Sequence, residues 1–399
     1  MNKKLGLAVA GAVLALSSAA QAGITIPAGD WTVDISGNVN AFYINNQSKD
    51  SATINGGLAN KEANNNNSSS SINTGLLPSW LTIGAKTRQN DLDVTWAISF
   101  QPGASQKASL GGGGGSEFRQ AYFTFGDASW GTIKIGKDLG VFGSDAILSD
   151  MTLLGVGSQG VVGAAGGTTT TLGRIGTGYM YADFNGQINY TTPNWNGFKA
   201  TVGIDQPLNT LNLSSQSADS TGTGQQSPAF VALASYSWTG DVAGKVWAEA
   251  KTQRIELADD LGRKTANVYG LGANVNAGAF GLTGYYYNGK GAGTTAFLMD
   301  GFDADGKRRE SDGYYVQGTY VIPSGTKLGV SFGESKLDRA SGEASSVLVK
   351  ENRMTTFGAY HPLTKSVNLV AEYSNVRSKN HDGDKVDSNI ISLGGILFF

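Results

Sequence analysis

Apolar and polar residues alternate along most of this chain. In residues 79–89, Leu81 and Ile83 fall on one side, and Lys86 and Arg88 fall on the other. A repeat of two predicts a β-strand, because successive side chains of a strand point to opposite faces. Similar alternation is found in residues 131–137, 245–253 and 314–322. Each predicted strand therefore has one apolar face and one face of charged, amide and hydroxyl groups.

The last residues of the chain follow the same pattern. Ile391, Leu393, Leu397 and Phe399 stand at alternate positions in "NIISLGGILFF". Terminal residues of soluble domains usually fray into water. An apolar strand at the end of the chain must have its apolar face shielded from water. The pattern therefore predicts a strand that is held by the rest of the fold.

The connections between the predicted strands alternate in length. Short turns are expected at 90–91, 127–130, 194–197, 276–281, 323–325 and 361–366. Long polar connections are expected at 45–78, 102–115, 138–178, 206–227, 290–311 and 336–350. Together these segments predict about 16 strands in an up-and-down meander, with short turns at one end and long loops at the other.

This arrangement favours a transmembrane β-barrel over a soluble sandwich, which has no reason to segregate short from long connections. In a membrane barrel the apolar side faces lipid and the polar side faces the lumen. Backbone hydrogen bonds must be satisfied within the protein, so the first and last strands are expected to pair. About 16 strands enclose a water-filled lumen. Membrane-spanning helices are excluded, because no stretch outside the N-terminal 22 residues approaches about 18 continuous apolar residues.

Composition narrows the chemistry that is available. The chain of 399 residues contains 57 Gly, no Cys and 2 His, so disulfides, thiolate metal sites and cysteine nucleophiles are excluded. Because His361 and His381 are the only histidines in the sequence, a catalytic triad or a histidine-rich metal centre is disfavoured. The formal charge is only −2, which does not suggest nucleic-acid binding. No catalytic residue, metal or other cofactor is expected.

The first 22 residues have the features of an export signal. A basic start at Lys3 and Lys4 precedes an apolar stretch, and Ala20-Gln21-Ala22 matches a small-residue cleavage site. The alternative, a retained anchor, is disfavoured because the apolar stretch is too short to span a bilayer. We expect residues 1–22 to be a cleaved signal peptide and residues 23–399 to form the barrel.

Two segments carry a family resemblance. "FRQAYFTFGDASWGTIKIGKDLGVFGSD" and "INYTTPNWNGFKATVG" resemble strand and hairpin motifs of the Gram-negative general porins. The resemblance implies an all-β, 16-stranded, homotrimeric outer-membrane barrel that is not an enzyme and admits small hydrophilic solutes and ions by passive diffusion. It implies contact with outer-membrane lipid, lipopolysaccharide and the assembly machinery, for which Phe399 would be the recognition signal. It also implies a third loop, residues 138–181, that folds into the pore as a constriction.

In that family, acidic residues on the third loop face basic residues on the wall. Carried over to this sequence, the acidic candidates are Asp138, Asp145 and Asp150, and the basic candidates are Lys86, Arg88, Arg119 and Lys134. Arg174 and Asp183 are further charges near the end of the loop. We rank Arg119 and Lys134 first. If Phe123 and Phe125 face lipid, however, Arg119 faces the lumen only if a β-bulge shifts the alternation, or else it lies at the trimer contact.

The chain departs from the family at three places. Asn38 stands after Gly37, where the family commonly has a lysine or arginine. Ser79-Trp80 stands where an arginine is common near the start of the second strand, and Tyr181-Ala182-Asp183 stands where an arginine often precedes the strand that leaves the third loop. The ion preference is therefore left open. A wall lysine or arginine could equally be a solvated lumen residue or a partner of lipopolysaccharide phosphates. A channel selective for one nutrient class, such as small organic acids, is the alternative function. A barrel enzyme or adhesin and a secreted soluble β-protein are the remaining alternatives.

Overall fold

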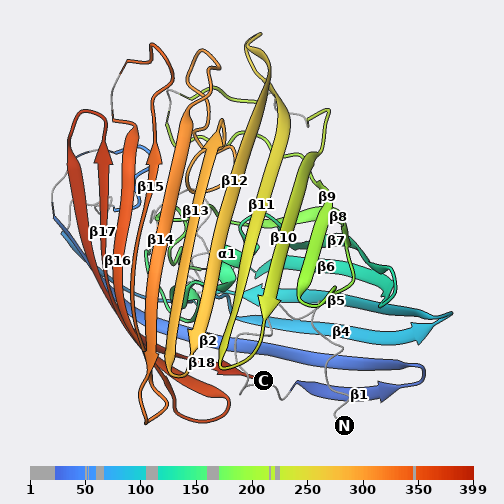
Figure 1. The fold of residues 1–399 in the computed structure, drawn as a ribbon. Helices are drawn as coiled ribbons and strands as arrows, with labels where there is room; N and C mark the ends of the chain where they lie inside the picture. Colours follow the sequence, from blue (N-terminus) through green and yellow to red (C-terminus); the bar gives the residue numbers. More distant parts are fainter. Residues whose placement is uncertain are drawn as a thin grey trace.

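The structure, a computed structural model, describes residues 23–49, 52, 54–59, 67–104, 116–159, 170–214, 217–220, 225–344 and 347–399 (Figure 1). The expected signal peptide at 1–22 and the glycine run at 111–115 lie outside these residues, as do residues 160–169 of the expected constriction loop. Among the residues that are described, no helix has the length and apolar character needed to cross a membrane.

The chain folds into a closed, antiparallel, 16-stranded barrel. The barrel positions, in chain order, are β2 (Trp31–Lys49), β3 with β4 (Ser68–Asn73 and Trp80–Gln89), β5 (Leu92–Pro102), β6 (Ser116–Asp127), β7 (Gly131–Leu139), β8 (Phe184–Thr191), β9 (Phe198–Asp205), β10 (Ala229–Trp238), β11 (Val242–Leu257), β12 (Gly262–Ala277), β13 (Phe280–Lys290), β14 (Glu310–Val321), β15 (Lys327–Leu337), β16 (Val349–Pro362), β17 (Val367–Asn380) and β18 (Lys385–Phe398). Each barrel position pairs with the positions before and after it along the chain. The predicted meander of about 16 strands is confirmed.

The barrel closes between its last and first long strands. β18 pairs with β2 in a register that places Leu393 opposite Tyr43. Beyond the end of β18, Gly37 and Phe399 exchange backbone hydrogen bonds of 2.8 and 3.0 Å. A short strand, β1 (Ile24–Ala28), continues along the same side of β2. The predicted pairing of first and last strands is confirmed.

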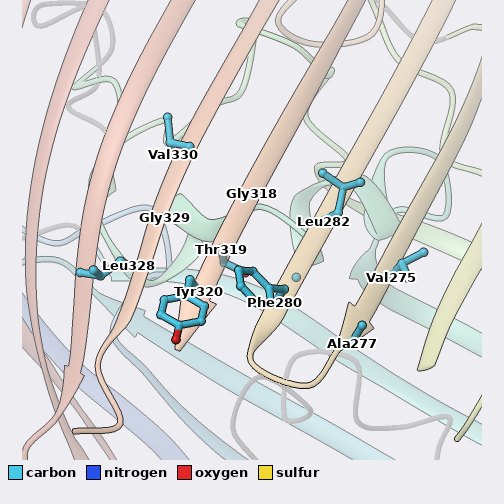
Figure 2. Close-up of a pocket in the computed structure, with 11 residues that line it drawn as sticks. Val275, Ala277, Phe280, Leu282, Gly318, Thr319, Tyr320, Leu328, Gly329 and Val330 are labelled. Atoms are coloured by element: carbon cyan, nitrogen blue, oxygen red, sulfur yellow. The ribbon is translucent and has the colours of Figure 1, made fainter. Parts of the chain in front are cut away.

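The outward face of the barrel is apolar. Val39, Leu271, Leu282 and Leu393 are all more than half exposed. Between β12 and β15 this face contains a shallow hollow of about 760 Å³ (Figure 2). The rings of Phe280 and Tyr320 close one end of the hollow, with centroids 4.7 Å apart. Because the outward alternation is apolar, this surface suits hydrocarbon.

One expected loop contains a strand. β3 lies inside the connection predicted at 45–78, and it pairs with the second half of β2, while β4 pairs with the first half. The two strands thus share one barrel position, and residues 74–79 leave the wall between them. A strand of four serines with one isoleucine carries too little hydrophobic contrast to be predicted.

Two short helices lie in the connection after β7: α1 (Ser144–Leu148) and the 3₁₀ turn η3 (Met151–Leu154). Figure 1 shows α1 in the middle of the barrel rather than outside its rim. The connection itself runs from residue 140 to residue 183, between the end of β7 and the start of β8. It is called the inward loop below.

Candidate functional site

The first limb of the inward loop is fastened to β11 and β14. The Gly143 amide donates to Glu249 Oε2 at 3.0 Å, and the Met151 amide donates to Gln317 Oε1 at 2.7 Å. The Tyr315 hydroxyl donates to the Ala146 carbonyl at 2.8 Å. Side chains of the wall therefore satisfy the backbone of a loop that would otherwise leave polar groups unpaired inside the protein.

The far end of the described first limb is held by β17. Glu372 Oε2 accepts from the amides of Val156 and Gly157, at 2.8 and 2.9 Å. Glu372 Oε1 accepts from the Tyr360 hydroxyl at 2.6 Å. Hydrogen bonds to a carboxylate are about twice as strong as neutral ones, so this residue is a firm attachment point.

The return limb is fastened to β15 and β16. The Gly178 amide donates to Ser335 Oγ at 3.0 Å, and Arg174 Nη1 donates to the Met354 carbonyl at 3.0 Å. Arg174 is 0 % exposed, so it braces the loop and presents no charge to solvent. The contacts described so far lie on β11 and β14–β17, which leaves the wall from β4 to β9 facing the remaining passage.

Asp150 ties the two limbs of the inward loop together. It caps η3 by accepting from the Thr152 amide at 2.9 Å, and it accepts from the Tyr179 hydroxyl at 2.9 Å. Asp150 as a whole residue is 4 % exposed. The family pattern assigned this residue to the pore surface, whereas its contacts give it a bracing position.

Asp145, in the first turn of α1, faces a basic group that the sequence candidates omitted. Lys245 Nζ on β11 lies 2.5 Å from Asp145 Oδ1. Lys199 on β9 lies close enough to Lys245 for the two charges to repel each other. Alternation in β9 and β11 places both lysines on the lumen side, opposite in phase to the exposed Val202 and Val246. That alternation was the signal that could have identified them.

Lys134 and Asp138 form an ion pair on the wall. Both belong to β7 and point to the same face, and Gln120 Nε2 also donates to Asp138 at 2.8 Å. Lys134 Nζ stands over the Tyr122 ring, 4.9 Å from its centroid. Asp138 is therefore a strand residue on the basic side, so the prediction that it lies on the loop is wrong.

Arg119 reaches the lumen through a bulge. The register between β5 and β6 shifts between Ser99 and Gln101, so alternation changes phase next to Arg119. Phe118 points outward, while Arg119 is 12 % exposed in its side chain and donates to the Tyr181 hydroxyl at 3.3 Å. The bulge resolves the conflict in alternation that the sequence posed.

The remaining candidates lie at the ends of the wall and loop. Lys86 pairs with Asp34 at 3.3 Å, and Arg88 pairs with Asp93 and Asp127 at 2.9 and 3.0 Å. Arg88 stands beside the short turn 90–91, away from the inward loop.

Asp183 closes the base of the inward loop. Its carbonyl accepts from the Gly140 amide at 2.8 Å, and its carboxylate accepts from the Phe184 amide. Arg119 and Asp183 thus lie near the end of the inward loop that leads into β8. Asp145 lies apart from them, in the first turn of α1.

A wide, closed barrel with polar side chains inside, apolar side chains outside and a loop fastened across its lumen is the architecture of an outer-membrane channel. The family model described as Gram-negative porin matches residues 6–381. The chain belongs to this family. It is a channel of the Gram-negative outer membrane that allows passive diffusion. Family and fold indicate a channel rather than an enzyme.

Solved structures with this fold share little sequence with the chain. The outer-membrane channel DcaP of Acinetobacter baumannii is 17% identical with a TM-score of 0.67, over 95% of this chain and 100% of that one. An anion-selective porin from Comamonas acidovorans is 15% identical with a TM-score of 0.64, over 92% and 100%. A trimer form of OmpT of Vibrio cholerae is 14% identical with a TM-score of 0.55, over 92% and 99%. No curated protein sequence matches the chain.

Proposed function

We propose that the pore filters small hydrophilic solutes and ions by charge at the level of α1. The observation that carries this proposal is the group formed by Asp145 on the inward loop with Lys245 and Lys199 on the wall. Opposite charges held on facing sides of a narrow aqueous passage create a transverse field that orients dipolar solutes. Lys134 and Asp138 extend the same layer along β7.

The balance of this layer favours anions slightly. Asp145 offsets Lys245, and Asp138 offsets Lys134. Among the residues that the structure describes, no carboxylate lies within ion-pair distance of Lys199. One lysine without a carboxylate partner attracts anions, and screening weakens this attraction as salt rises because the Debye length is about 10 Å at 0.1 M.

Reconstitution of the purified protein in planar bilayers under a salt gradient tests this function. We expect three-step closure of a wide aqueous pore and a small anion preference in the reversal potential. Lys199→Gln should move the reversal potential toward cations, and Asp145→Asn should move it toward anions. Glu351→Gln, on the outward face of β16, serves as the control and should leave it unchanged.

The absence of any conductance would contradict the channel, and unchanged reversal potentials in both lumen variants would contradict the charge filter. Three-step closure would also support the homotrimer, for which the trimer form of Vibrio cholerae OmpT is the precedent.

We also propose that lipopolysaccharide contacts the outward face near the long loops. Above the apolar band, the outward faces of β15–β18 carry ion pairs whose basic side chains are 31–42 % exposed and whose carboxylates are largely covered: Lys336 with Glu334, Arg353 with Glu351, and Arg377 with Asp387. Basic groups in such a belt suit headgroup phosphates.

A further inference from the structure

The side of the inward loop that faces β4–β6 is lined by aliphatic side chains. A cavity of about 600 Å³ lies there, and Leu148, Leu153 and Leu172 line it from the loop. Leu76 and Leu77 line it from the segment that precedes β4, and Trp80 lines it from the first position of β4. The Leu76 amide donates to the Gly155 carbonyl at 2.9 Å, which holds this segment against the loop.

The opposite side of the cavity carries charges that are already paired. Arg119 and Glu117 form an ion pair of 2.7 Å. The Arg119 guanidinium also stands over the Phe184 ring, 5.5 Å from its centroid. Asp183 accepts from the Phe184 amide. Lys137 also lines the cavity, so its charged lining consists of two basic and two acidic residues and has no excess of one sign.

Such a lining distinguishes solutes by their apolar surface more than by their net charge. Each Å² of apolar surface that is removed from water contributes about 25 cal/mol of favourable free energy. A cavity floored by leucines therefore retains an aliphatic body longer than a polar one of equal size. The adjacent guanidinium and carboxylate groups match the two charges of a zwitterionic head.

We propose that this cavity is a transient binding site, on the route through the pore, for small solutes with an aliphatic body and a zwitterionic head. Amino acids with branched aliphatic side chains are the simplest members of this class. The site lies beneath the long connections that contribute Leu211 and Met299 to its lining. This inference rests on the proposed function, because a solute reaches the cavity only if the pore conducts.

The conductance of potassium chloride through reconstituted channels, measured with added solute, tests the inference. Leucine and asparagine are both zwitterions of nearly equal mass, and they differ in side-chain polarity. We expect leucine to lower the conductance in a saturable manner, with a half-effect in roughly the millimolar range, and asparagine to lower it much less. 4-Methylpentanoate, which lacks the ammonium group of leucine, should bind more weakly than leucine because Glu117 lies beside Arg119.

Three variants refine the test. Leu148→Asn and Leu172→Asn change partly buried cavity residues and should abolish the leucine effect while the channel still conducts. Lys199→Gln changes the charged layer and should keep the leucine effect. Equal effects of leucine and asparagine, or tighter binding of 4-methylpentanoate than of leucine, would overturn the inference. A loss of all conductance in the unmodified protein would instead overturn the channel function.

Discussion

At the scale of single residues, Glu372 shows how a wall side chain determines the path of the inward loop. One of its carboxylate oxygens accepts two loop amides, and the other accepts the Tyr360 hydroxyl. Both oxygens are needed as acceptors, so no neutral residue of the same size satisfies all three donors. The position of the loop therefore depends on a carboxyl group on a strand that is far away in sequence.

Glu372→Gln should loosen the loop without unfolding the barrel. An amide has one acceptor oxygen, so either the loop amides or the Tyr360 hydroxyl lose their partner, at a cost of about 1–3 kcal/mol for each buried donor that is left unpaired. We expect greater open-channel current noise and a lower thermal unfolding temperature. Ser388→Ala, which changes a buried hydroxyl that bonds Ser48 instead of the loop, is the matched control. Equal noise in both variants would contradict this role of Glu372.

The sequence predicted the strand face on which a side chain lies better than it predicted the residues that the side chain contacts. Alternation placed Lys245, Trp247 and Glu249 together on the polar side of their strand, and the structure confirms this placement. It did not show that Lys245 meets Asp145, because the path of the inward loop depends on contacts with distant strands. A bulge at Arg119 was one of two alternatives that the sequence left open, because the choice between them depends on the register with the neighbouring β5.

At the scale of elements, close approach requires glycine where the inward loop meets the wall. A Cβ at Gly155 would overlap the Glu372 carboxylate, and a Cβ at Gly75 would overlap the Gly155 carbonyl. By contrast, a Cβ at Gly284 on β13 would have no atom within 4 Å. The first two positions therefore depend on the absence of a side chain, and the third does not.

Gly155→Ala should displace the loop from Glu372. The overlap forces the backbone or the carboxylate to move, which typically costs about 1–3 kcal/mol when a packed region is overfilled. We expect a lower unfolding temperature and altered single-channel conductance. Gly284→Ala should change neither quantity by more than the measurement error. A stable, normally conducting Gly155→Ala channel would show that the loop can shift without penalty.

Elements with strong alternation were predictable, and those without it were not. The short turns at 90–91 and 323–325 were located correctly, because turn residues separate alternating segments there. β3 was assigned to a loop because its serines give no hydrophobic contrast. β1 was also missed, since its pairing with β2 is a tertiary feature.

At the scale of the whole molecule, closure brings the last residue onto the first long strand. Phe399 exchanges two backbone hydrogen bonds with Gly37, and we propose that its aromatic ring also serves as the signal read by the assembly machinery. The barrel class was predictable from the sequence, because the strand number and the alternation of long and short connections report overall topology. The direction in which the inward loop crosses the lumen was not.

Phe399→Ala separates the two roles of this residue. It leaves the backbone bonds to Gly37 in place and removes the ring, so the folded barrel should keep its heat resistance. We expect less folded protein in the outer membrane, measured as heat-modifiable mobility of membrane fractions. Phe357→Ala, at an exposed outward position of β16, removes a similar ring and should assemble normally. Equal yields of the two variants would contradict a signalling role of Phe399.

The hollow between β12 and β15 has a practical consequence for spectroscopy. A side chain added at Gly318 would meet no atom within 4 Å, and the chain contains no cysteine. A single cysteine at this position can therefore be labelled with a nitroxide that neither competes with another thiol nor strains the strand. Such a label, flanked by Phe280 and Tyr320 (Figure 2), would report the order of the surrounding acyl chains while the pore itself stays unmodified.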